Sequence, residues 1–211
     1  MHKRLNTSNN SSLVIDRLCD QVEVGNTAVA CFYCDFYSPY ELSPTGLLGA
    51  LLKQVVSALE PIPDEVKKAF ENSRGGIGGR KLLLHEILPM LLKCLSRLRR
   101  VFICIDALDE FPEKHRLELW ESLQQIMQMC PNTRLFLTGR LHIREEAKKH
   151  FPKAEKLSII TRASDIALYL RMRLDRDSEL EAQDKELEAD ILKIIPEVTS
   201  GTYAFSQLIE F

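Results

Sequence analysis

The sequence lacks several features that would place it in familiar classes of protein. It has no apolar run near the length of about 18 residues that spans a membrane, and its opening, MHKRLNTSNNSS, has no apolar core typical of a secretory signal. It also lacks an excess of either charge, because 28 basic residues nearly balance 30 acidic ones and leave a formal net charge of -2. We therefore expect a cytoplasmic protein that contacts no membrane and does not bind nucleic acid directly.

Clustered metal or disulfide ligands are also missing. The six cysteines are scattered without the spacing of zinc ligands or of a small disulfide scaffold, and the five histidines are isolated from one another. Cys31 and Cys34 form a C-x-x-C in AVACFYCDF. In a strand, however, residues three apart point to opposite faces, whereas the redox motif needs the start of a helix. We interpret the cysteines as reduced core residues.

A phosphate-binding loop is the third missing feature. Such a loop has the pattern G-x-x-x-x-G-K-[ST] between a strand and a helix, because its backbone N–H groups and lysine surround phosphates while the hydroxyl binds magnesium. The chain contains no Gly-Lys-Ser or Gly-Lys-Thr. GGIGGRK, from Gly75 to Lys81, has no Ser or Thr, is broken by Arg80 and follows a helical pattern. It is interpreted as a flexible loop.

The segments that are present alternate between strand and helix patterns. The composition, 45% hydrophobic and 27% charged over 211 residues, suits a globular domain with a substantial core. Buried strands are predicted at 26–37, 100–107, 133–140 and 154–160, and helices at 11–24, 44–59, 63–73, 80–98, 112–130 and 143–151. The remainder, 163–211, is predicted to be helical, including TYAFSQLIE at 202–210. This alternation predicts a parallel sheet covered by helices.

Three carboxylates follow the second predicted strand. In RRVFICIDALDEF, Asp106 comes directly after the apolar run, and Asp109 and Glu110 follow within four residues. Ligands of open parallel sheets bind beyond the carboxyl ends of the strands, and a magnesium ion with phosphate oxygens would relieve the repulsion among these groups. The alternative is a strand followed by an acidic helix start, in which Asp109, Glu110 and Glu113 complement the helix dipole.

This acidic segment resembles the Walker B segment of P-loop NTPases. Together with SSLVIDRL, VACFYCDFYSPYELSPTGLLGALLKQ, TRLFLTGR and ASDIALYLRMRL, it resembles the NACHT-type (STAND) signalling NTPases that are abundant in filamentous fungi, some of them classified as nephrocystin-like N-terminal domains and often carrying repeats. The resemblance implies that Asp106 holds magnesium and that Asp109 or Glu110 polarises the attacking water.

By the same resemblance, LFLTGR corresponds to a sensor strand that usually ends in Thr-Ser-Arg-Pro. Arg140 would then face the γ-phosphate, and Thr138 would line the nucleotide site. Two positions depart from the family pattern, because Gly139 stands for the serine and Leu141 for the proline. The alternative is that Arg140 is simply a solvated charge at the end of a strand.

The fold class implied is α/β, a P-loop NTPase-like parallel sheet flanked by helices, lacking the first strand and followed by a small helical subdomain. We expect a polar segment at 1–10, a partial NACHT-like domain at 11–162 and the start of a helical lid at 163–211. The phosphate loop would precede SSLVIDRL, where only polar residues stand, so we expect a chain that begins too late. The sheet should then be open between the sensor strand and the last strand, with an exposed edge.

The leading functional hypothesis is a NACHT-type signalling NTPase site with Walker B and sensor elements but no Walker A, deficient in hydrolysis on its own. Mg²⁺ and ATP or GTP are the expected cofactors of the intact family domain, with the alternative that this chain binds neither. The second hypothesis is a non-catalytic interaction module that associates with itself or with full-length relatives. A haloacid dehalogenase-type phosphatase ranks low, because it needs Asp-x-Asp and the spacing here is Asp-x-x-Asp.

Overall fold

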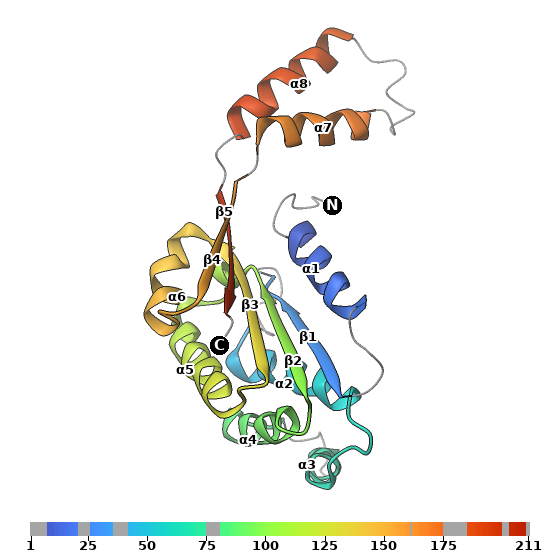
Figure 1. Cartoon of the computed structure of the whole chain (residues 1–211), viewed down its shortest axis with the longest axis vertical. Coiled ribbons are helices and arrows are strands. Elements are labelled where there is room, and N and C mark those ends of the chain that lie inside the picture. The colour runs from blue at the N-terminus through green and yellow to red at the C-terminus, as the bar shows by residue number, and fades with distance from the viewer. Residues whose placement is uncertain are drawn as a thin grey trace. The chain divides into compact units, whose positions relative to one another are not determined.

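A computed structural model describes residues 8–20, 26–35, 42–74, 81–160, 162–174, 185–199 and 203–209. The chain divides into two compact units. The first comprises Met1–Leu157 and Phe205–Phe211, and the second is Ser158–Ala204. The candidate site and most of the sheet lie in the first unit, and the second unit contains two helices with the end of β4 and the start of β5 (Figure 1).

Five strands form the sheet, in the order β1-β2-β3-β5-β4 (Figure 1). Their bounds are β1 Thr27–Tyr33, β2 Arg100–Asp106, β3 Thr133–Arg140, β4 Glu155–Ile160 and β5 Tyr203–Ile209. β1 pairs in parallel with β2, with Cys31 opposite Cys104, and β2 pairs in parallel with β3, with Cys104 opposite Phe136. The first four strands confirm the predicted ones, and the three paired in parallel make the fold α/β.

Helices connect the first four strands, as parallel strands require. The first unit contains α1 Ser8–Asp20, α2 Pro44–Ser57, α3 Asp64–Arg74, α4 Leu84–Leu95, η1 Leu108–Glu110, α5 Glu113–Met129, η2 Leu141–Ile143 and α6 Arg144–His150, and the second contains α7 Ala163–Leu174 and α8 Lys185–Thr199. α2 begins where the Ser43 hydroxyl accepts a hydrogen bond from the Gly46 N–H, with Pro44 in the first turn. No helix in the described ranges combines the length and apolarity needed to cross a membrane.

The core lies between one face of the sheet and α2, α4 and α5. Alternate residues of a strand point to opposite faces, and Ile103, Ile105 and Leu135 are buried on this face. They belong to one cluster with buried residues of the three helices, among them Leu47, Leu51, Val55, Leu91, Leu95, Leu119 and Leu123. This packing fixes the positions at which β2 and β3 end, and hence the positions of the polar residues that follow.

The outer edge of β1 is closed at one residue by a side chain. The amide oxygen of Gln54 on α2 accepts a hydrogen bond from the Cys31 N–H at 2.9 Å, and its amide nitrogen donates to the Cys31 carbonyl at 2.8 Å. These bonds satisfy backbone groups that an edge strand otherwise offers to another chain. Of the six cysteines, all free, four are buried, Cys31 is half-buried and Cys19 is exposed, so Cys19 is not the core residue we expected.

Two predictions about the sheet are wrong. The segment Tyr203–Ile209 is strand β5 rather than part of a helix. Tyr203, Phe205 and Ile209 are residue types that favour strands, and a short segment without clear helical period takes the structure that its tertiary pairing dictates. The sheet is also not open between β3 and β4, because β5 lies there.

Candidate functional site

Asp106 ends strand β2 and lies at the centre of the candidate site. The apolar residues before it, Ile103 and Ile105, are fully buried, and the Asp106 residue itself is only 3% exposed. The hydroxyl of Thr138, near the end of neighbouring β3, donates a hydrogen bond to the Asp106 carboxylate. Because the parallel strands end at the same edge of the sheet, the sequence-predicted residues Asp106 and Thr138 are brought into direct contact.

Ala107 turns the chain away from the sheet directly after Asp106. Its backbone is in the left-handed region, with φ 54° and ψ 45°, which a residue with a Cβ rarely adopts. The Ala107 N–H donates to Thr138 Oγ1 at 2.9 Å, and its carbonyl accepts from the Glu110 N–H at 2.8 Å. These bonds hold a strained residue where the turn η1 begins, as is common at functional sites.

Asp109 and Arg140, both predicted to be catalytic, form an ion pair. Arg140 Nε lies 3.4 Å from Asp109 Oδ2, and the Arg140 backbone N–H donates to Asp109 Oδ1 at 3.2 Å. The Asp109 side chain is 5% exposed and that of Arg140 is 63% exposed. The carboxylate is therefore fixed inside the site, while most of the Arg140 side chain is exposed to solvent. Glu110 ends the same turn and is half-buried.

Gly139 separates Thr138 from Arg140 in a position where a Cβ would force Ile143 to move. A Cβ at this residue would lie 2.5 Å from Cδ1 and 3.2 Å from Cγ1 of Ile143, which is itself buried, and 3.4 Å from Asp109 Oδ1. The glycine thus lets η2 and Asp109 approach the end of β3 closely. The serine expected at this position by resemblance would not fit without a shift of Ile143.

Cys34 is a residue of the site that the sequence interpretation missed. It directly follows β1, and its backbone N–H donates to the Asp106 carbonyl at 2.9 Å. Burial raises the pKa of the Cys34 thiol, and the nearby carboxylates of Asp106 and Asp109 raise it further. The available signal was its position at the carboxyl end of the strand next to β2, but Cys34 was interpreted only as a reduced core residue once a redox role for the C-x-x-C was rejected.

The donor set limits what metal the site could hold. Within the described ranges, no group of three or more His, Cys, Asp or Glu side chains is arranged to bind an ion. Asp106 therefore offers one carboxylate and not a closed set of protein ligands. Mg²⁺ commonly keeps several waters and binds one or two carboxylates together with substrate phosphates. The residues present fit magnesium only as the partner of a bound nucleotide.

Two segments discussed from the sequence lie outside the described residues. These are 1–7, within the polar segment at 1–10, and 75–80, which make up most of GGIGGRK. α1 begins at Ser8, before the predicted start at 11, and 21–24 at its predicted end are also outside the described ranges.

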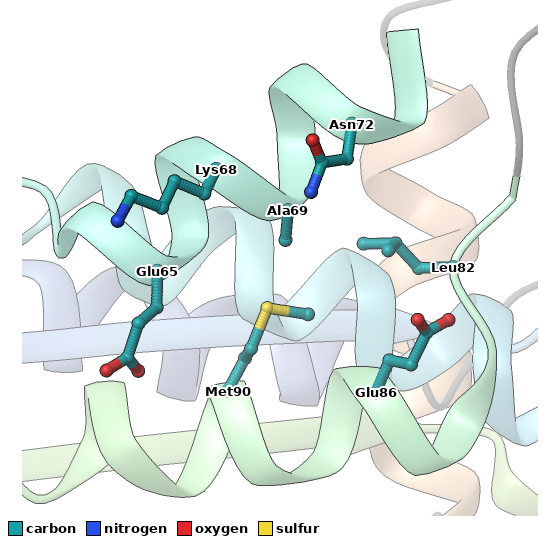
Figure 2. A pocket seen from close by; sticks show the side chains of 7 residues that line it. All are labelled: Glu65, Lys68, Ala69, Asn72, Leu82, Glu86 and Met90. Atoms are coloured by element: carbon teal, nitrogen blue, oxygen red, sulfur yellow. The ribbon is translucent and has the colours of Figure 1, made fainter. Parts of the chain in front are cut away.

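Two hollows lie beside α3, away from the strand ends. The first has a volume of about 320 Å³. Figure 2 shows the side chains that line it: Glu65, Lys68, Ala69 and Asn72 of α3, Leu82, and Glu86 and Met90 of α4. The second, of about 490 Å³, is mainly apolar and includes Leu52, Ile62 and Phe70. Glu65 pairs with Lys93 of α4, so one of the carboxylates at the first hollow has a structural partner. None of the candidate site residues lines either hollow.

The chain was compared with families, curated proteins and solved structures. A family model described as nephrocystin 3, N-terminal, matches residues 8–140, which is more than half of the 211 residues. The matched segment ends at Arg140 and so contains Asp106, Asp109, Glu110 and Thr138 as well. No curated protein and no solved structure matches the chain.

Proposed function

Because the chain belongs to the nephrocystin 3, N-terminal, family, we propose that its strand-end site is the magnesium- and water-handling half of a NACHT-type nucleotide site with a P-loop NTPase-like fold. The observation that carries the proposal is the contact between Asp106 and Thr138 at the ends of adjacent parallel strands, with the Asp109–Arg140 pair beside it. Nucleotide sites of open α/β sheets lie at this edge.

Each residue has a role that its position allows. Asp106 would hold the magnesium of a magnesium–nucleotide complex, most simply through water, and Thr138 keeps the Asp106 carboxylate in one orientation. A bound magnesium ion would supply charge stabilisation to the phosphates. Asp109 or Glu110 would orient a water, and the exposed guanidinium of Arg140 would contact the terminal phosphate after leaving Asp109.

In this proposal the chain does not hydrolyse ATP or GTP on its own. The printed sequence has no Gly-Lys-Ser or Gly-Lys-Thr, so it lacks the lysine and hydroxyl that hold nucleotide phosphates in P-loop enzymes. The proposed function is therefore a nucleotide-responsive signalling module, served by Mg²⁺ with ATP or GTP, rather than an independent enzyme.

Turnover is the experiment that tests this proposal. Release of phosphate from ATP and from GTP is measured with the purified chain, with Asp106→Ala, and with Asp165→Ala as a matched control that removes an exposed carboxylate from α7. We expect all three chains to remain at the level of the blank. Turnover at the rate of an intact P-loop enzyme, abolished by Asp106→Ala and retained by Asp165→Ala, would overturn the claim of deficiency.

A second candidate function is a non-catalytic interaction module that associates with itself or with longer relatives. It is favoured by the way in which the site residues satisfy one another, Asp106 with Thr138 and Asp109 with Arg140. Light scattering after size exclusion tests self-association, and co-migration with a purified longer relative tests the other partner. A monodisperse monomer that co-migrates with no relative would count against this function.

A further inference from the structure

Strand β5 occupies an unusual place for a strand that follows β4 in the sequence. β1, β2 and β3 are neighbours both in sequence and in the sheet, but β3 and β4, which follow one another in sequence, are separated by β5. Figure 1 shows that β5 also runs against the direction of β3. A strand that follows both of its neighbours in sequence therefore fills an internal position between them.

The position is one strand wide. Neighbouring strands lie about 4.8 Å apart, so β3 and β4 are separated by about twice that distance, which is too far for direct backbone hydrogen bonds. If β5 left, the facing edges of β3 and β4 would both carry unpaired N–H and C=O groups. Such groups cost free energy when they are not satisfied and pair readily with another extended chain.

The connection between β4 and β5 runs through the second unit. Of β5, Phe205–Ile209 belongs to the first unit, whereas Ser158–Ala204 forms a compact unit of its own. The crossovers that link β1, β2, β3 and β4 do not include β5. Withdrawal of β5 therefore breaks its strand pairing without unthreading any of these connections.

We propose that the position between β3 and β4, here called the β5 slot, is a strand-exchange site that accepts β5 from a second copy of this chain. A second copy supplies the same seven residues and can therefore reproduce the same pairing, which is the basis of domain swapping. The β1 edge is a poorer target, since Gln54 already satisfies the Cys31 backbone there. The inference does not depend on nucleotide binding.

Hydrogen exchange on the full chain tests whether β5 protects its neighbours. Ser206→Pro, in the middle of β5, removes a backbone N–H that pairing needs. Its matched control is Ser164→Pro in the first turn of α7, where proline is tolerated. We expect Ser206→Pro to speed exchange in β3 and β4 by about tenfold or more while α2 keeps its protection. Equal exchange in β4 of both variants would overturn the proposal.

A peptide with the sequence of residues 201–211 then tests the slot directly. We expect the labelled peptide to bind the Ser206→Pro chain with one site and to restore protection of β4, and we expect a peptide carrying the same proline not to bind. Equal binding of both peptides, or of neither, would overturn the proposal.

If Ser206→Pro does not fold, strand exchange is tested by mixing isotope-labelled and unlabelled copies of the unmodified chain. Native mass spectrometry of the mixture should show a mixed dimer that excess 201–211 peptide dissociates. A chain that stays monomeric at every concentration reached, or a dimer indifferent to the peptide, would contradict strand exchange.

Discussion

The Thr138 hydroxyl donates a hydrogen bond to the Asp106 carboxylate and accepts one from the Ala107 N–H, whose nitrogen lies 2.9 Å from Thr138 Oγ1. One side chain of β3 thus satisfies a buried carboxylate of β2 and the donor of the residue that follows it. The pair of bonds fixes the orientation of Asp106 and stabilises the left-handed backbone of Ala107.

Thr138→Val should therefore strongly destabilise the chain, although threonine and valine side chains have similar shapes. It leaves the Ala107 N–H and one bond of the Asp106 carboxylate unsatisfied in a buried place, which costs about 1–3 kcal/mol in the free energy of unfolding. Chemical denaturation provides the measurement. Thr138→Ser is the control that keeps the hydroxyl, and equal stability of the valine and serine variants would show that the hydrogen bonds contribute little.

Gly139→Ala tests the close approach of Ile143. The added Cβ would lie 2.5 Å from Ile143 Cδ1, so we expect a loss of about 1–3 kcal/mol from overpacking. Ile143→Val removes Cδ1 and should restore part of that loss in the double variant. A double-mutant cycle measured by denaturation gives the coupling, and simple additivity of the two substitutions would contradict the proposed clash.

The sequence was sufficient to locate the strand ends but not the pairing of the residues there. Ile103 and Ile105 mark a buried strand by their apolarity, so Asp106 could be placed at its end. That Asp109 faces Arg140 rather than standing free depends on how η1 and β3 pack, which local pattern does not encode. Gly139 could be noticed as a departure from the family pattern, but its cause, the position of Ile143, required the structure.

Strand β5 shows the same limit. Tyr203, Phe205 and Ile209 favour strands, but the segment is short and the helical segments before it made a helix the simpler expectation. The structure of Tyr203–Ile209 is decided by its pairing with β3 and β4. The segment begins more than 40 residues after the end of β4. Such long-range pairing cannot be inferred from the local period of one short segment.

The stability of the contact between α5 and α6 should depend on pH through His150. Its ring stacks on Trp120 with centroids 5.4 Å apart, and its Nδ1 lies 3.2 Å from Gln124 Oε1. Burial lowers the pKa of His150 below its ordinary value of 6.5, and neighbouring Lys149 lowers it further, whereas Glu146 and Glu121 act in the opposite direction. The folded state therefore binds this proton more weakly than the unfolded state.

It follows that the contribution of neutral His150 is present above about pH 6.5 and is lost as the pH falls below it. The measurement is the free energy of unfolding of the unmodified chain relative to His150→Phe, which keeps an aromatic ring for the stack. We expect the unmodified chain to lose stability relative to His150→Phe as the pH falls from about 7.5 to about 5. Other histidines are common to both chains, and a difference that is constant with pH would contradict the assignment.

Thiol reactivity should divide the cysteines by burial. Burial raises the pKa of Cys104 to about 12, with smaller contributions from Cys31 and Cys19. The pKa of the Cys34 thiol is raised by burial and by the carboxylates of Asp106 and Asp109. Cys19 is exposed on α1. A thiol reagent at mildly alkaline pH should label Cys19 first and Cys34 and Cys104 only on unfolding. Cys19→Ser should remove the fast phase, and fast labelling of Cys34 located by peptide mapping would contradict its burial.

The central claim is that the strand-end site retains the magnesium-handling half of a nucleotide site. The most direct measurement is equilibrium titration of the chain with a fluorescent ATP or GTP analogue, with and without Mg²⁺, for the unmodified chain, Asp106→Asn and the control Asp165→Asn. The account predicts weak binding that Mg²⁺ strengthens in the unmodified and control chains and does not strengthen in Asp106→Asn. Binding that is absent, or that responds equally to Mg²⁺ in all three chains, would contradict it.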